Sequence, residues 1–166
     1  MTRLNSALNQ IRAARNYTTD LLGNLVSDDW FRQPTEGVTH IGWQVGHLAV
    51  ANYHLALVRI RGKQLQDNET IPENYFTLFG KGSTPESNAA SYPTPDEICN
   101  VYDRVHDKIV DELSSLADET LDDPVESPHP MFDTKLGALV WCAQHEFLHA
   151  GQIGMLRRLF GNAPLR

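Results

Sequence analysis

The sequence has few cysteines and no long apolar run, and each absence excludes a class of protein. Only Cys99 and Cys142 occur, so a disulfide-stapled secreted domain is excluded, and we expect free thiols in a reducing, cytoplasmic setting. No stretch approaches the roughly 18 consecutive apolar residues that a membrane span needs. The polar, amphipathic N-terminal stretch 1–16 also lacks the apolar core of a secretory signal.

Basic residues are scarce as well. The chain has 14 Lys and Arg against 21 Asp and Glu, which gives a formal net charge of −7. Because binding to a phosphate backbone relies on neutralisation by Lys and Arg, we expect no nucleic-acid partner. With 166 residues, 41% of them hydrophobic, the chain has the size and composition of one soluble globular domain spanning residues 1–166.

Hydrophobic periodicity predicts an all-α protein with four long helices. No alternation typical of a strand competes with it. Thr39 is expected to be the N-cap of the second helix, and Thr94-Pro95-Asp96-Glu97 has the pattern of a capping box with proline at N1. Gly161 is expected to stop the last helix. The four predicted stretches are Arg3–Val26, Thr39–Arg61, a third that begins at Thr94, and Thr134–Gly161.

The predicted connection between the second and third helices, Gly62–Pro93, is about thirty residues long. A segment of that length can run back along a helix of about 20 residues, or 30 Å. The sequence therefore predicts a four-helix bundle with a long crossover between helices two and three. We expect the crossover to form an ordered cover, either a lid that moves at Gly80 and Gly82 or a static brace, because it holds five large apolar residues: Tyr75, Phe76, Leu78, Phe79 and Tyr92.

The fourth predicted helix contains the pentapeptide HEFLH, residues 145–149, which matches the H-E-x-x-H zinc signature of metalloproteases. Such enzymes need a further ligand downstream, and no His, Asp or Glu follows His149. Helical geometry places Glu146 about 100° from His145, on the flank of the helix. These features argue against a protease.

The spacing of His145 and His149 nevertheless suits a metal ion, because residues four apart lie one above the other on a helix. The alternative is a hydrogen-bonded structural pair. The second helix has histidines at intervals of seven, of which His47 lies on the apolar side and is the expected third ligand. His54 is the reserve, and His40 is expected to be solvated at the helix start. His106 is expected to be solvated and His129 to lie in a turn.

The stretch HEFLHAGQIGMLRRLFGNAP resembles the C-terminal signature of DinB-like (YfiT-like) proteins, and THIGWQVGHLAV resembles their second helix. The capped third helix fits too, so the resemblance covers nearly the whole chain. It implies a four-helix bundle that holds one divalent metal ion (nickel, zinc, iron or manganese) through His47, His145 and His149. Some DinB-like proteins transfer bacillithiol or use mycothiol. The crossover is longer than is usual in the family, so the pocket and the substrate do not carry over.

Two functions therefore stay open, a metal-dependent transferase that acts with a low-molecular-weight thiol on a small-molecule substrate, and a non-catalytic metal-binding bundle. Residues that share a face with the expected ligands are candidates for the pocket, namely Trp43, His54, Trp141 and Gln152. Cys142 is expected to be a buried apolar residue rather than a nucleophile. The opposite side of the last helix predicts a homodimer through an apolar, small-residue stripe, if the crossover does not cover it: Val140, Ala143, Phe147, Ala150, Gly151 and Gly154.

Overall fold

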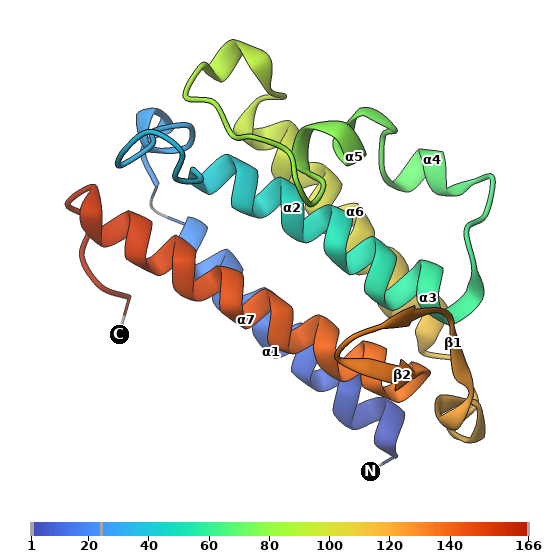
Figure 1. Cartoon of the computed structure of the whole chain (residues 1–166). Coiled ribbons are helices and arrows are strands. Elements are labelled where there is room, and N and C mark those ends of the chain that lie inside the picture. The colour runs from blue at the N-terminus through green and yellow to red at the C-terminus, as the bar shows by residue number, and fades with distance from the viewer. Residues whose placement is uncertain (1, 24, 166) are drawn as a thin grey trace.

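The computed structural model describes residues 2–23 and 25–165, and within them four long helices form an all-α bundle. Helices α1 and α7 run side by side in one direction, and α2 and α6 run in the other (Figure 1). Helix α7 also packs against α2, which brings the two predicted histidine-bearing elements together. The four helices are α1 (Arg3–Leu22), α2 (Ile41–Tyr53), α6 (Pro95–Leu113) and α7 (Lys135–Leu159).

The predicted helix ends are confirmed in α6 and α7 and corrected in α1 and α2. The capping box forms at Thr94, and the Thr134 hydroxyl accepts from the Gly137 N–H. In α2 the N-cap is His40 rather than Thr39, because the His40 Nδ1 accepts from the Trp43 N–H at 3.0 Å. Helix α1 ends at Leu22, four residues before the predicted Val26, and Asn24 lies outside the described residues.

The second predicted helix is continuous to Arg61 but changes its winding. After α2 comes a π-helical turn, η2 (His54–Val58), and then α3 (Arg59–Arg61). The Arg59 N–H bonds to the His54 carbonyl five residues earlier. The segment ends at Gly62, whose φ of 80° lies in the left-handed region that glycine adopts without strain.

The crossover joins two helices that run in the same direction, which explains its length. It contains α4 (Asp67–Thr70), α5 (Asn74–Phe79) and the short η3 (Ala89–Ser91), and it packs on α2 and α6. Tyr75 and Phe79, which belong to α5, are buried. Because α5 lies directly on α2, the crossover covers the same helix that carries His47 (Figure 1).

A small β-hairpin contradicts the expectation that no strand would form. β1 (Pro124–His129) pairs antiparallel with β2 (Phe132–Thr134), just before α7. The hairpin follows η4 (Asp118–Asp122), and another short turn, η1 (Ser27–Asp29), follows α1. β1 is exposed or half-buried along its whole length, so it has no apolar alternation, and its sequence therefore reads as a loop.

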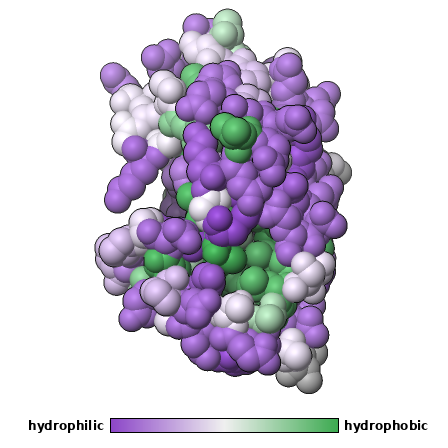
Figure 2. Space-filling model, turned by 90° about the vertical axis from the view of Figure 1, so that its right-hand side faces the viewer, coloured by the Kyte–Doolittle hydropathy of each residue, from purple (hydrophilic) through white to green (hydrophobic). Residues whose placement is uncertain are grey.

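Figure 2 shows the side of the molecule that lies to the right in Figure 1, and most of its surface is hydrophilic. Hydrophobic residues gather in one patch in the lower half of Figure 2. Among the described helices, none combines the length and the apolar character that crossing a membrane requires.

Candidate metal centre

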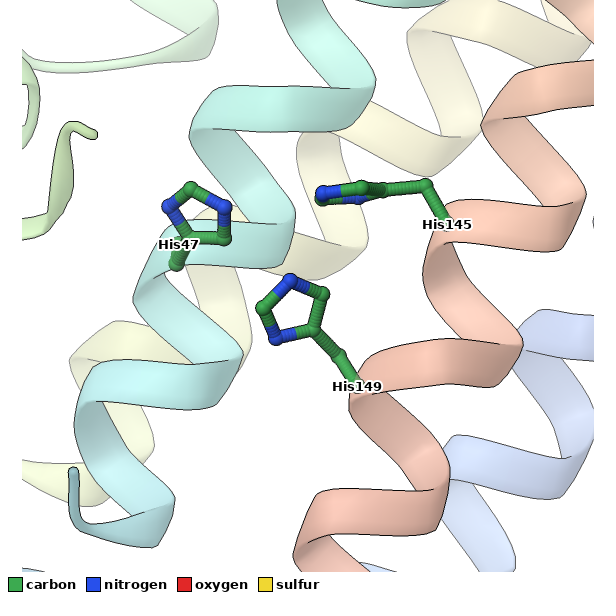
Figure 3. Close-up of side chains that lie close together, drawn as sticks. All are labelled: His47, His145 and His149. Carbon is green, nitrogen blue, oxygen red and sulfur yellow. The ribbon is translucent and has the colours of Figure 1, made fainter. Parts of the chain in front are cut away.

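Three imidazole rings converge in the space between α2 and α7. His47 projects from α2, and His145 and His149 project from successive turns of α7 (Figure 3). One ring nitrogen of each lies within 4.8 Å of the others. Two nitrogens that share an ion at about 2.1 Å are at most about 4.2 Å apart, so closing on an ion requires shifts on the order of an ångström. The predicted set of three histidines is thus brought together.

A backbone carbonyl of the crossover fixes the orientation of His47. The His47 Nδ1 lies 2.8 Å from the Phe79 carbonyl oxygen. Because a carbonyl only accepts, Nδ1 carries the proton and Nε2 keeps a free lone pair. A hydrogen bond of this kind orients metal-binding histidines in proteins generally.

Gly46 allows that carbonyl to approach. A Cβ added at Gly46 would lie 2.5 Å from the Phe79 ring, closer than any real carbon contact. The absence of a side chain at this position therefore lets α5 lie on α2. The close packing of α5 on α2 therefore requires glycine at position 46. The same packing places the Phe79 carbonyl beside His47 and so determines which tautomer His47 adopts.

A side-chain amide fixes His149. The His149 Nδ1 donates to the Gln44 Oε1. The Gln44 amide nitrogen in turn donates to the Thr39 hydroxyl at 2.5 Å and to the Gln152 Oε1 at 2.8 Å, which orients the amide with its oxygen toward His149. The Nε2 of His149 is therefore left free for a metal ion. Gln152 acts here through Gln44 and does not line the pocket, where it was predicted to lie.

His145 makes no such bond. Its Nδ1 is buried and has no hydrogen-bond partner among the described residues. Burial, and secondarily the neighbouring imidazoles, lower the pKa of His145 to about 4 and that of His149 to about 3. Burial also lowers the pKa of His47. All three rings are therefore neutral at pH 7, which is the form that binds a metal, and a buried nitrogen without a partner is the feature that a bound ion would satisfy.

The glutamate of the H-E-x-x-H pattern lies elsewhere. Glu146 is fully buried in the core rather than on the flank of the helix, where it was predicted. Tyr102 donates to one carboxylate oxygen, and the Asn52 amide donates to the other at 2.7 Å. With both oxygens engaged by α6 and α2, Glu146 does not serve the histidines as a general base. The match to the protease signature therefore carries no protease chemistry.

A pocket of about 870 Å³ opens beside the three histidines. His47 and His145 lie in its lining, and so do three of the four predicted pocket residues, Trp43, His54 and Trp141. The Trp43 ring stacks on His47 with 4.7 Å between centroids, and its N–H donates to the Ser83 hydroxyl at 2.8 Å. Trp43 therefore links the wall of the pocket to the crossover, and its stacking fixes the plane of the His47 ring.

The pocket also contains residues that the sequence did not single out. Arg59, Lys81 and His129 line it, the last from β1, where it stacks on Phe132 at 4.3 Å. The π-helical turn is the reason that Arg59 was missed. At 3.6 residues per turn, Arg59 would lie about 120° from His47 around the helix. One extra residue in a turn reduces that angle to about 20°.

The remaining histidines and Cys142 do not belong to the centre. His40 is fully buried as the N-cap of α2 rather than solvated, and His106 is half-buried rather than solvated. His54 lies on the pocket wall and is not a member of the convergent set. Cys142 is buried, and its thiol donates to the side-chain Oδ1 of Asn52 at 3.3 Å. Burial raises the pKa of its thiol well above the usual range, which agrees with an apolar role and not with a nucleophile.

The comparison with protein families agrees with this geometry. The sequence model of the DinB superfamily matches residues 10–153. The chain belongs to the DinB superfamily. That match includes all three convergent histidines and the whole crossover. None of the curated proteins matches the sequence, so the family assignment and the geometry of the site together carry the functional argument for this DinB-superfamily protein.

Proposed function

We propose that this DinB-superfamily protein binds one divalent metal ion through His47, His145 and His149 and is a transferase that joins a low-molecular-weight thiol to a small electrophile. The observation that supports it is the convergence of three neutral imidazoles beside a pocket, with two of them oriented by hydrogen bonds. Nickel, zinc, iron and manganese all accept imidazole ligands. A bound divalent ion supplies Lewis acidity that lowers the pKa of a thiol.

The transfer balances without a redox partner. A bond forms between the sulfur and an electrophilic carbon, the bond from that carbon to its leaving group breaks, and the thiol proton departs with the leaving group. The protein's own residues supply the setting for this exchange. Trp43 and Trp141 provide flat apolar walls, and the hydrogen bonds from His47 to Phe79 and from His149 to Gln44 keep two rings in place. Pre-organisation of this kind is what separates a site from a loose cluster.

One observation favours the second candidate, a metal-binding bundle without catalysis. Among the described residues, no Asp, Glu or Cys lines the pocket, so a general base of the carboxylate type and a cysteine nucleophile are both missing there. A reaction whose nucleophile comes with the substrate fits such a lining best. A thiol cosubstrate meets that condition, which is why the transferase is the first candidate.

The test is metal analysis combined with a thiol screen. Protein purified without chelator is expected to hold close to one divalent ion per chain, and His149→Ala is expected to bind that ion at least about 100-fold more weakly. Glutathione, cysteine and 2-mercaptoethanol are then each mixed with 1-chloro-2,4-dinitrobenzene, and chloride release is followed with and without the metal. Metal-dependent release supports the transferase. Metal binding without turnover with any thiol supports the non-catalytic bundle, and less than about 0.1 ion per chain after reconstitution overturns both.

We further propose that the protein is cytoplasmic and forms a homodimer. Helix α1 covers part of the stripe predicted as the interface, since Ala143 and Ala150 are buried against the chain's own core. Next to it, an exposed line of uncharged residues continues along α7 as Leu148, Gly151, Met155 and Leu159. For a chain of net charge −7, an uncharged face is the place where two copies meet with the least repulsion.

Light scattering measures the assembly directly. A dimer gives twice the monomer mass of 18.7 kDa, and the double variant Met155→Glu, Leu159→Glu is expected to return it to the monomer while the metal content stays unchanged. Both side chains are about half-exposed or more, so their replacement leaves the core intact. A wild-type mass near 18.7 kDa at tens of micromolar refutes the dimer.

A further inference from the structure

The lining of the pocket beside the three histidines is unbalanced in charge. Arg59 and Lys81 both line it, from α3 and from the crossover. No Asp or Glu of the described chain lies in the same lining. In a protein with a net charge of −7, this concave surface carries the opposite sign, and a concave wall concentrates the field of such charges.

Arg59 is held in place without an acidic partner. Its Nη1 donates to the Ser127 carbonyl at 2.5 Å, to the Ser127 hydroxyl at 2.9 Å and to the Pro128 carbonyl at 3.3 Å. Its Nε is buried and has no partner among the described residues, and no described hydrogen bond uses Nη2. One corner of the guanidinium is therefore anchored to β1, Nε is enclosed by the fold without a partner, and Nη2 makes no described hydrogen bond.

Arg61, two residues along, shows what a structural arginine looks like in this protein. It pairs with Asp67 at 2.8 Å and with Glu112 at 2.5 Å. The neighbouring carboxylates thus satisfy Arg61 within the fold. Arg59 is turned toward the pocket by the π-helical turn, and its described contacts are carbonyl and hydroxyl oxygens of β1 and the face of the Phe132 ring, 5.5 Å from Cζ to the centroid. Its positive charge has no counterpart of opposite sign in the described chain.

The geometry points to an organic anion as the pocket's ligand, with a carboxylate that accepts from Nη2 of Arg59 and with Lys81 at the rim. Hydrogen bonds from a guanidinium to a carboxylate are charge-assisted and stronger than neutral ones. The apolar part of the lining, which includes Val50, Leu55 and Phe76, fits the hydrocarbon part of the same molecule. Only the conclusion that this anion is a substrate rests on the proposed function. Anion binding itself can be measured without the metal.

The test uses a matched pair of probes, 4-phenylbutyrate and its amide, which differ in charge and hardly in shape. Calorimetric titration is done with metal-free protein and with metal-loaded protein, because a carboxylate also binds metal ions. We expect the acid to bind about tenfold tighter than the amide in both forms. The same preference is expected to vanish in Arg59→Met, to fall about threefold in Lys81→Met and to persist in Arg104→Met, whose exposed side chain lies on α6 outside this pocket.

Two further measurements cover the case in which Arg59→Met loosens the hairpin. Arg59→Lys keeps the charge but not the planar guanidinium, and it is expected to retain part of the preference. Lys81 is exposed, so Lys81→Met leaves the fold intact and reports only on the electrostatic contribution of the Lys81 charge. Equal binding of acid and amide by the wild type, or no binding of either at millimolar concentration, overturns the inference.

The outcomes separate this inference from the proposed function. A preference for the acid that appears only with metal and survives in Arg59→Met assigns the anion to the metal centre, which overturns the role of Arg59 and leaves the metal site standing. A preference that depends on Arg59 in a protein that takes up no metal supports the anion site and removes the transferase.

Discussion

Two polar clusters lie on neighbouring faces of α7, and they differ in how completely their hydrogen bonds are satisfied. Glu146 faces the core, where both of its oxygens accept a bond. His145, the residue before it, faces the pocket, and its Nδ1 has no partner in the described chain. Neighbours in sequence thus serve different purposes. A polar group whose bonds are all made within the fold holds the fold together, and one that is left unsatisfied is available for a ligand.

The two clusters also differ in what surrounds them. Arg15 lies over the Tyr102 ring at 3.3 Å and pairs with Asp103, so a positive charge stands close to Glu146. Burial raises the pKa of Glu146, while the bonds from Tyr102 and Asn52 act against that rise. The pocket lining beside the histidine cluster contains no described Asp or Glu, and it contains the cations Arg59 and Lys81. An ion of charge +2 therefore meets three neutral donors, and no acidic side chain of the lining offsets its charge.

The largest effect is expected from breaking the satisfied cluster. Glu146→Leu leaves the Tyr102 hydroxyl and the Asn52 amide buried without acceptors, which is expected to lower the free energy of unfolding by about 3 kcal/mol. Urea denaturation measures it. The folded variant is expected to keep its metal, because Glu146 bonds to Tyr102 and Asn52 and is not one of the three convergent residues.

A double variant tests the reason for that loss. Tyr102→Phe combined with Glu146→Leu removes one of the two orphaned donors, so it is expected to recover about 1 kcal/mol relative to Glu146→Leu alone. A variant Glu146→Leu that is as stable as the wild type but loses its metal would reverse the roles assigned to the two clusters.

A smaller effect is expected from the partner of His149. Gln44→Ala removes the acceptor of the His149 Nδ1–H, so the ring is free to rotate and to change tautomer, and metal affinity is expected to fall about tenfold. Competition against a chelator of known affinity measures it. Gln44→Glu restores an acceptor at the same place and is expected to stay within about threefold of the wild type.

Gln152→Ala is the matched control for Gln44. It removes only the outer bond to the Gln44 amide nitrogen, and because Gln152 is exposed its loss creates no cavity. Its effect on metal affinity is expected to be about twofold. Equal losses in Gln44→Glu and Gln44→Ala would show that Gln44 acts through packing and not as an acceptor.

The sequence predicted the site well where helical geometry alone decides. His145 and His149 are four residues apart, and His47 lies on the apolar side of its helix, so a long-helix bundle has to bring them into the interior. The capped start at Thr94 and the length of the crossover can also be read directly from the sequence, and together they predicted the order of the helices. These features depend on local spacing, which is what a sequence shows directly.

The rest depends on contacts between distant segments. His40 takes the N-cap role through the bond that its Nδ1 accepts from the Trp43 N–H, and its ring is buried between elements distant in sequence, where it contacts Phe31 and Tyr92. β1 has no alternation that predicts a strand. Burial of Glu146 requires donors on two other helices, which no spacing within α7 reveals. The placing of Arg59 requires a π-helical turn, for which the hydrophobic pattern has no signal. Sequence reasoning therefore found the histidines and three residues of the pocket wall, Trp43, His54 and Trp141, and missed its charged residues and His129.

The smallest effect is expected at His106, which tests whether a buried nitrogen without a partner is by itself enough to make a metal site. Its Nδ1, like that of His145, is buried without a partner in the described chain, but it does not belong to the convergent set of three. Acidic and basic side chains of its own helix and of α1 surround it, namely Asp103, Asp107, Arg12 and Arg15.

His106→Ala is therefore expected to leave the metal content unchanged and to alter the free energy of unfolding by less than about 1 kcal/mol. The same preparation, analysed for metal and by urea denaturation beside His149→Ala, gives both values. An unsatisfied nitrogen becomes a binding site only where other donors stand within reach of one ion, because a single imidazole does not compensate the loss of the ion's hydration. Loss of metal in His106→Ala would mean that the ion is held elsewhere than between α2 and α7.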